Sequence, residues 1–357
     1  MAQIQSIKKI YSDGRHNAFT DIEYWKGRYY VAFRNGNGHA RPGPLEVQGK
    51  IIVIRSEDLM EWEVCARIST DGDDRDPALL HLGDELGVYF CTVLAADPKQ
   101  TDVYEGGLGE KGTAIQSHMA FTSDGVSWSS PESVHEFNYV FWQVERFGDH
   151  CYATSWGYSE NEGTLKIVHS PDGHTWENVA AIQPGNFPNE TGLWITPDRK
   201  MHLISRERTR EMSVLSESDP PYTDWQSRDL NYTVHCPVFR PVGDELWVSG
   251  KTITAQFPSS VQIPAEPSPE KIASLARLDE RLAKTPQDWH TAIWRLVGHQ
   301  LEPILVLPSR GDCGYPGLVV EEDRVLMSFY SQHDVDEGPE PKPGECANEI
   351  YLAEIGV

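Results

Sequence analysis

The chain has 357 residues, of which 39% are apolar and 24% are charged, so it can bury a core and is unlike a disordered chain. Its 54 Asp and Glu residues outnumber 31 Lys and Arg residues, and the formal net charge of −23 would repel nucleic acids and anionic membranes. We therefore expect neither a nucleic-acid nor a membrane partner.

Hairpin patterns recur along the whole chain. Each consists of an apolar stretch, a short turn that contains Gly, Asp or Pro, and a second apolar stretch, which is typical of two antiparallel strands. In chain order, the six predicted hairpins are Ala18–Phe33, Ala78–Val93, Tyr139–Trp156, Leu193–Ser205, Pro237–Gly250 and Gly317–Tyr330.

A second pattern alternates with the hairpins. It combines a strand-like run with a turn in which Ser and Asp are followed by turn residues and Trp. The runs are Lys50–Arg55, His118–Thr122, Leu165–His169 and Met212–Leu215, and the turns are Ser56–Trp62, Ser123–Trp128, Ser170–Trp176 and Ser218–Trp225. We expect the Asp carboxylate to accept backbone N–H bonds inside each turn while the Trp covers it.

The remaining predicted elements complete the outer part of each unit. Further outer strands are expected at Ile272–Leu278 and Glu349–Ile355, and one short helix at Asp279–Lys284. Four strands in each of six units predict an all-β, six-bladed β-propeller that forms a single domain over residues 1–357. Because the last strand needs a partner, we expect Ile4–Ile10 to pair with it, so that the N- and C-terminal strands close the ring in one blade.

The turn at Ser170–Trp176, with the sequence Ser-Pro-Asp-Gly-His-Thr-Trp, resembles the Asp-box, or BNR repeat, of the sialidase (neuraminidase) superfamily. As a repeat architecture, this resemblance covers nearly the whole chain. Such turns also occur in lyases and in non-catalytic propellers, so they indicate the fold more than the activity. The resemblance implies a site at the mouth where the innermost strands converge.

Three residues match the catalytic pattern of that family. By this resemblance Tyr315, in Gly311–Leu318, is the nucleophile, and Glu190, in Asn189–Ile195, is its partner carboxylate. Arg206, one hairpin after Glu190, would clamp a substrate carboxylate. A neutral phenol can approach an anionic substrate, and a neighbouring carboxylate can take its proton.

The match to the family is incomplete, which indicates a divergent member that lacks the full arginine triad. The stretch His16–Asp21 stands where the first arginine is expected, and Lys251 is the cation nearest to the place of the third. The loop Arg34–His39 takes the place of the acid/base aspartate. His39 can transfer a proton at neutral pH, and Asp76 is the alternative acid or a turn carboxylate.

Further residues are predicted to contact the substrate around the mouth. Trp142 would stack on a sugar ring, its alternative role being core packing between blades. The other predicted substrate contacts are Arg34, Arg75, Arg208, Lys251, His16, Asp21 and His333.

No metal site and no cofactor are predicted, because neither a Cys-x-x-Cys nor a His-x-x-x-His spacing occurs. The six cysteines are expected to be mostly buried free thiols. Residues Met1–Ile10 lack the pattern of a secretory signal, so the chain as written is expected to be cytoplasmic, or secreted or periplasmic if a leader was removed.

Three functions remain open from the sequence. The first is hydrolysis of a glycosidic bond of an acidic sugar, of the ulosonic or uronic type. The second is elimination by a polysaccharide lyase on the same propeller, with His39 or Tyr315 abstracting the proton next to a uronate carboxylate. The third is carbohydrate binding without turnover. All three imply a carbohydrate partner, while the linkage, the stereochemical outcome and the oligomeric state stay open.

Overall fold

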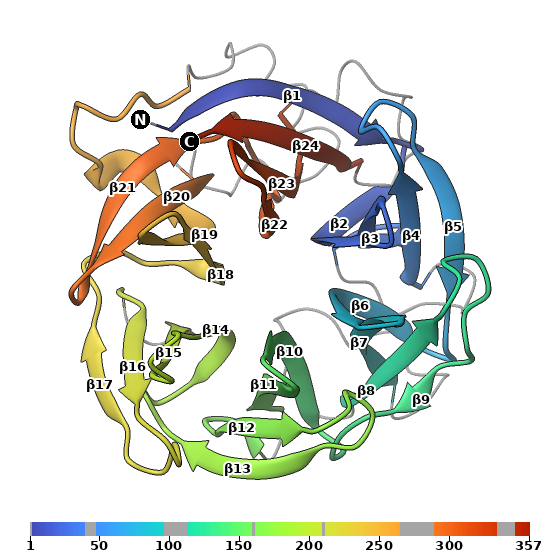
Figure 1. Cartoon of the computed structure of the whole chain (residues 1–357), viewed down its shortest axis with the longest axis horizontal. Helices are drawn as coiled ribbons and strands as arrows, with labels where there is room; N and C mark the ends of the chain where they lie inside the picture. Colours follow the sequence, from blue (N-terminus) through green and yellow to red (C-terminus); the bar gives the residue numbers. More distant parts are fainter. Residues whose placement is uncertain are drawn as a thin grey trace.

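The computed structural model describes residues 2–39, 48–95, 113–158, 161–208, 211–264, 289–333 and 347–357. Within these ranges the chain forms six antiparallel four-stranded sheets that stand around a ring (Figure 1). The predicted all-β, six-bladed propeller is therefore confirmed. A 3-10 turn lies at Thr254–Gln256, and no helix among the described residues is long and apolar enough to cross a membrane.

Each blade has the same order of strands from the hub outward. The strands next to the hub are β2 (His16–Trp25), β6 (Asp73–Leu82), β10 (Tyr139–Phe147), β14 (Pro188–Ile195), β18 (His235–Val242) and β22 (Gly314–Val320). The second strands are β3 (Arg28–Gly36), β7 (Glu85–Ala95), β11 (His150–Gly157), β15 (Met201–Glu207), β19 (Glu245–Ile253) and β23 (Arg324–Ser331). Each first strand pairs with the second strand that follows it, so all six predicted hairpins are confirmed.

The third and fourth strands form the outer part of the ring. The third strands are β4 (Lys50–Ser56), β8 (Thr113–Thr122), β12 (Leu165–Ser170), β16 (Val214–Ser218), β20 (Trp289–Val297) and β24 (Glu349–Gly356). The outermost strands are β5 (Glu63–Ile68), β9 (Glu132–Ser133), β13 (Glu177–Ile182), β17 (Gln226–Asp229), β21 (Gln300–Val306) and β1 (Gln3–Tyr11).

The two ends of the chain close the ring in one blade, as predicted. Strand β1 pairs antiparallel with β24, with Ile4 opposite Ile355, and the termini lie side by side in Figure 1. This pairing covers the edge that β24 would otherwise leave open.

The Asp turns after β4, β8 and β12 have the expected hydrogen bonds. In each turn one carboxylate oxygen, of Asp58, Asp124 or Asp172, accepts two backbone N–H bonds of 2.7–3.0 Å. The fourth turn differs, because there the Ser218 hydroxyl donates to the carbonyl of Asp224 at 2.6 Å and the Trp225 indole donates to the carbonyl of Tyr222 at 2.9 Å.

The sequence analysis did not predict the third and fourth strands, β20 and β21, of the blade that begins with β18. Its third strand is β20, which pairs with β19 so that Gly250 lies opposite Ala292. The predicted strand Ile272–Leu278 and helix Asp279–Lys284 lie outside the described residues. Several apolar runs follow this hairpin in the sequence, and only the long-range pairing with β19 identifies β20.

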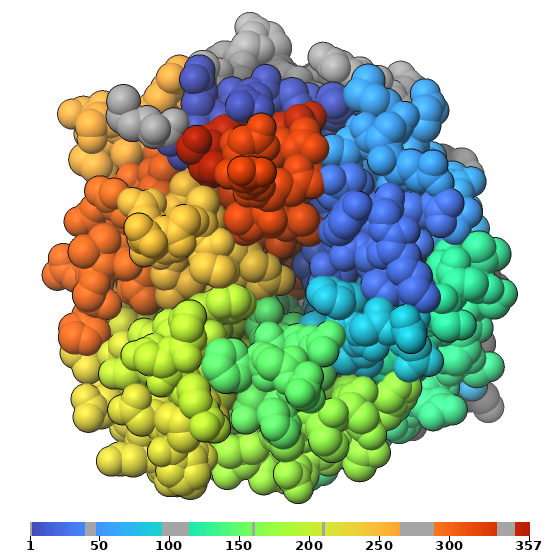
Figure 2. Space-filling view, in the orientation of Figure 1, coloured from blue at the N-terminus to red at the C-terminus, as the bar shows by residue number. Residues whose placement is uncertain are grey.

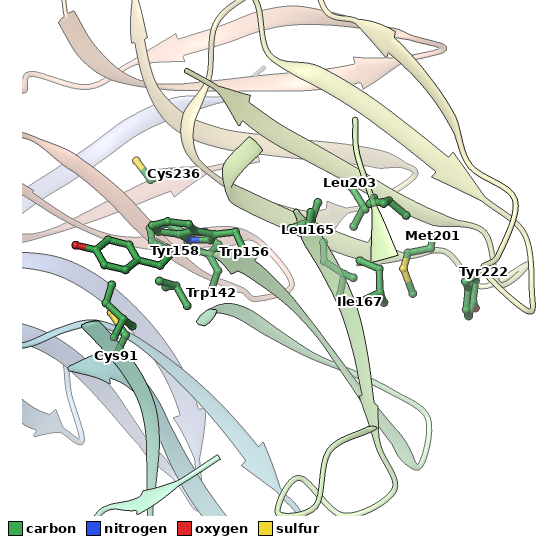
Figure 3. Packing of buried hydrophobic residues seen from close by; sticks show 14 of the residues in the cluster. Cys91, Trp142, Trp156, Tyr158, Leu165, Ile167, Met201, Leu203, Tyr222 and Cys236 are labelled. Atoms are coloured by element: carbon green, nitrogen blue, oxygen red, sulfur yellow. The ribbon is translucent and has the colours of Figure 1, made fainter. Parts of the chain in front are cut away.

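Apolar side chains fill the spaces between neighbouring blades. One cluster runs outward from Trp142 through Trp156 and Tyr158 to Leu165 and Leu203 (Figure 3). The space-filling view shows that side chains occupy most of the room between the ribbons (Figure 2). In the described part Cys91, Cys151, Cys236 and Cys313 are buried free thiols, and Cys65 is half-buried, whereas Cys346 lies outside the described residues.

Candidate functional site

The beginnings of the six first strands converge at one mouth of the hub. Near the start of every first strand the pairing with the second strand shifts register. Four of these shifts contain a non-glycine residue with positive φ, namely Phe19 (59°), Asp76 (54°), Cys236 (46°) and Tyr315 (46°). A bulge of this kind redirects a side chain, and strained backbone of this kind is concentrated at functional sites.

Tyr315, Glu190 and Arg206 form one connected group at the mouth. The Tyr315 hydroxyl donates to Oε1 of Glu190 at 3.0 Å, and Nη1 of Arg206 donates to the same oxygen at 2.7 Å. The backbone amide of Cys236 donates to Oε2 of Glu190 at 2.8 Å. The structure therefore brings together the three residues that carried the family resemblance.

Burial and charge set the protonation states of this group. Burial raises the pKa of the Tyr315 phenol well above its ordinary value, and the nearby Asp76 and Glu190 add to this effect. Burial by itself would raise the pKa of Glu190, but Arg206 and the hydrogen bonds to the carboxylate outweigh it, and the pKa is lowered. At neutral pH the group thus pairs a neutral phenol with a carboxylate.

Aromatic rings hold Tyr315 in place from several sides. The ring of Phe19 lies 4.6 Å from that of Tyr315, and the Trp142 indole meets Tyr315 edge-on at 5.2 Å. Trp142 also belongs to the buried cluster between the blades, so it packs in the core and contacts the site. The Arg75 guanidinium carbon lies 4.9 Å from the centre of the Phe19 ring.

His39 reaches the same mouth from the loop after β3. Its Nδ1 lies 2.5 Å from Oδ2 of Asp312, and its ring meets the Phe19 ring edge-on at 5.2 Å. Phe19 therefore lies against both His39 and Tyr315. The side chain of His39 is 33% exposed, so the structure leaves it open to a ligand.

Asp312 is a site residue that the sequence analysis did not identify. Its carboxylate also receives a bond from the Tyr330 hydroxyl, 3.0 Å long, and contacts Nε2 of His16 at 2.8 Å. Burial by itself would raise the pKa of Asp312, but the interactions with His39 and His16 lower it well below the usual value. The available signal was its position three residues before Tyr315.

Three possible ligand atoms, one each from His16, His39 and Asp312, lie within 4.8 Å of one another, which is close enough to hold a metal ion. However, Nη1 of Arg34 faces Nδ1 of His16 at 3.3 Å. Because a guanidinium only donates, Nδ1 must accept, and the proton lies on Nε2, facing Asp312. This arrangement fits a hydrogen-bonded network better than a metal site.

Asp76 and Arg75 form a buried pair near the start of β6. Nε of Arg75 is 3.5 Å from Oδ2 of Asp76, and both side chains are buried. Burial raises the pKa of Asp76, and the negative Glu190 raises it further against the opposing effect of Arg75. The structure thus brings both predicted residues to the site, as a buried pair.

Arg34 and His16 are at the mouth but inaccessible to a substrate. Arg34 is 1% exposed and donates to Asp73 through Nε at 3.0 Å and Nη2 at 2.7 Å. His16 is fully buried, and this burial lowers its pKa to about 4. Instead of the predicted contacts with a substrate, their contacts support the wall behind His39.

Four other predicted residues make contacts of their own. Asp21 lines a cavity of about 50 Å³ beneath Tyr315, where burial raises its pKa to about 7. His333 packs on the Tyr351 ring of β24 at 4.5 Å, away from the first strands. Lys251 donates to the carbonyl of Gly311 at 3.2 Å, and Nη1 of Arg208 pairs with Glu162 at 3.3 Å. These four do not join the group around Tyr315.

The comparisons with known proteins support the fold. No family model matches the sequence, and no curated protein is similar to it. A mutant of Trypanosoma rangeli sialidase displaying trans-sialidase activity superposes with a TM-score of 0.64 at 10% identity, over 99% of this chain and 58% of that one. For Trypanosoma rangeli sialidase in complex with sialic acid the TM-score is 0.61 at 10% identity, over 95% of this chain and 54% of that one.

A third structure extends the comparison beyond Trypanosoma. The endosialidase of phage phi92 has a TM-score of 0.59 at 11% identity, over 99% of this chain and 69% of that one. The protein thus shares the sialidase-type propeller, as a divergent version, and spans little more than half the length of the Trypanosoma enzymes. At this identity the similarity concerns the fold, and the activity must be argued from the site.

Proposed function

We propose that the protein is a glycoside hydrolase that cleaves the glycosidic bond of an acidic sugar, with Tyr315 as its nucleophile. The observation that carries this proposal is the bond from the Tyr315 hydroxyl to Glu190, a buried carboxylate that also binds Arg206. A phenol on its own is a weak nucleophile, and an adjacent base activates it by taking its proton. A neutral nucleophile also avoids repulsion by an anionic substrate.

The proposed reaction has two steps. In the first, the phenolic oxygen of Tyr315 attacks the anomeric carbon, Glu190 takes the phenolic proton, and His39 gives a proton to the departing glycosidic oxygen. In the second, His39 takes a proton from a water molecule that attacks the anomeric carbon. The bond to Tyr315 then breaks, and the phenol recovers its proton from Glu190. Two displacements give retention of configuration.

Arg206 supports the choice of an acidic substrate. Its side chain is 30% exposed although Nη1 is bound to Glu190, so part of the side chain is open to a ligand. Guanidinium groups bind carboxylates in a planar, bidentate manner. A carboxylate held there would lie beside the hydrogen-bonded pair of Glu190 and Tyr315.

Asp312 has a positioning role in this proposal. A carboxylate that accepts from one nitrogen of a histidine fixes the ring and stabilises its protonated form. With Nδ1 of His39 held by Asp312, Nε2 is the atom that exchanges protons with the substrate. His16 and Tyr330 hold Asp312 in turn.

The test is product analysis on a panel of glycans that carry ulosonic or uronic acids. The proposal expects a free reducing sugar with retained anomeric configuration, followed by NMR, and its loss in Tyr315→Phe. If no glycan of the panel is turned over, the hydrolase proposal fails and carbohydrate binding without turnover is favoured.

A lyase is the second candidate, and the His39–Asp312 pair is the observation that favours it. A histidine held by a carboxylate is also a suitable base for removing the proton next to a uronate carboxylate. The products separate the two reactions, because elimination yields an unsaturated uronide that absorbs ultraviolet light and hydrolysis does not.

A further inference from the structure

The backbone of Tyr315 has a conformation that tyrosine rarely adopts. Its φ of 46° lies in the left-handed region, which is unfavourable for a bulky side chain. Pro316 follows directly, and a proline further restricts the residue before it. Strained backbone of this kind persists only where the surrounding structure holds it in place. The contacts of the Tyr315 peptide groups therefore decide where its side chain points.

Side chains from two other blades hold the backbone of Tyr315 at both ends. Oγ1 of Thr20, on β2, donates to the carbonyl oxygen of Tyr315 at 2.6 Å. The amide of Tyr315 donates to Sγ of Cys236, on β18, at 3.0 Å. The blades of β2 and β18 flank the blade of β22 in the ring (Figure 1). Thr20 and Cys236 are both buried, so water does not compete for either bond.

The bulge that contains Thr20 differs from the three related bulges. In each of the four bulges with positive φ, two residues lie between the paired positions, and the first of them has the positive φ. The second residue is Thr20 in β2 and a proline in the other three, namely Pro77, Pro237 and Pro316. A proline has no hydroxyl group and cannot make the bond that Thr20 makes.

The hydroxyl group of Thr20 is itself oriented. The Ser328 hydroxyl donates to Oγ1 of Thr20 at 3.1 Å. A hydroxyl group has one proton to donate, and Thr20 directs it to the carbonyl of Tyr315. Three buried groups thus form a chain that ends on the peptide group of Tyr315.

We propose that Thr20 is a positioning residue, which together with Cys236 keeps Tyr315 in the backbone conformation that directs its phenol to Glu190. The catalytic meaning of this inference rests on the proposed function, in which Tyr315 is the nucleophile. A misplacement of about 1 Å can cost about 10²-fold in rate. The bond from Tyr315 to Glu190 exists without a substrate, so the position of the phenol can also be measured without turnover.

The kinetic test compares two variants of Thr20. Thr20→Val keeps the shape but loses the hydroxyl group, and it should lower kcat about 10–100-fold with little change in KM. Thr20→Ser keeps the donor and should retain most of the activity. The control is Thr252→Val, because Thr252 is also buried and donates to the carbonyl of Thr233 at 2.6 Å. This control should keep kcat, and an equal loss of kcat in it would overturn the proposal.

The second readout is NMR of the full chain with ¹³C-labelled tyrosine, in which Tyr315→Phe identifies the signal of Tyr315. Thr20→Val should shift or broaden this signal, whereas Thr20→Ser and Thr252→Val should not. An unchanged signal in Thr20→Val would overturn the proposal, whatever the kinetics show.

Thermal melting shows whether Thr20→Val is folded. If it is not, Cys236→Ala, which removes the bond at the other end of Tyr315, replaces it with the same expected effects on kcat and on the signal. Full activity of Tyr315→Phe would reject the hydrolase, and the NMR comparison would still decide whether Thr20 positions the phenol.

Discussion

Tyr315 and Glu190 are 125 positions apart in the sequence, yet their side chains share a hydrogen bond of 3.0 Å across the hub. They stand on β22 and β14, and the strand between those two blades, β18, links them. The backbone amide of Cys236 donates to Glu190, and its sulfur accepts the amide of Tyr315 at 3.0 Å. The three blades therefore position the proposed nucleophile and its base jointly.

Removing either member of this pair should abolish the chemistry while the protein stays folded. We expect Tyr315→Phe and Glu190→Gln each to lower kcat by at least about 10³-fold, because residues that act as a unit fail together. The double variant should be hardly worse than either single one. The measurement is turnover of the best glycan of the panel, with circular dichroism as the folding control, and wild-type activity in both variants would show that the site is elsewhere.

The contact between His39 and Asp312 can be tested with a double-mutant cycle. His39→Gln should reduce kcat by about 10²–10⁴-fold, since it removes the group that exchanges a proton with the substrate. Asp312→Asn should change the pH profile of kcat, because the ring loses the carboxylate that holds it. If Asp312 acts through His39, the effect of Asp312→Asn should nearly vanish in a His39→Gln background. Fully additive effects would contradict this role.

Arg206 should discriminate acidic from neutral substrates. We expect Arg206→Lys, which keeps the charge beside Glu190, to lower kcat/KM for the carboxylate substrate by about 10–100-fold because the planar, bidentate contact is lost. The methyl ester of the same substrate has no carboxylate to bind, so it should react about equally slowly with the wild type and the variant. A wild-type enzyme that accepts acid and ester equally well would remove Arg206 from substrate recognition.

Burial of His16 predicts an acid-sensitive fold. Its pKa in the folded protein is about 4, below the ordinary 6.5, so the unfolded chain binds the extra proton between these values. Stability should therefore fall as the pH drops from about 6.5 to 4, by at most about 3 kcal/mol from this residue. His16→Gln, whose amide can reach the position of Nε2 and donate to Asp312, should flatten this part of the curve in urea titrations. An unchanged slope in the variant would assign the acid sensitivity to other groups.

The hairpins and turns were predictable because their signals are local. A Gly or Asp between two apolar runs specifies a hairpin, and the Asp172 carboxylate finds its backbone partners within three residues. Strand β20 was not predicted because it is recognised by its pairing with β19, and a long stretch of sequence separates the two strands. Nothing in the sequence around Trp289 or His235 indicates that the two residues line one cavity.

The six-bladed ring and the candidates Tyr315, Glu190, Arg206 and His39 were predictable before folding was considered, because repeat spacing and short motifs act over a few residues. The contact between Asp312 and His39 and the burial of Arg34 and His16 became apparent from the folded ring. Those contacts join segments that meet only when the ring closes. Burial strengthens these contacts, and burial depends on the folded ring instead of on any one segment of the sequence.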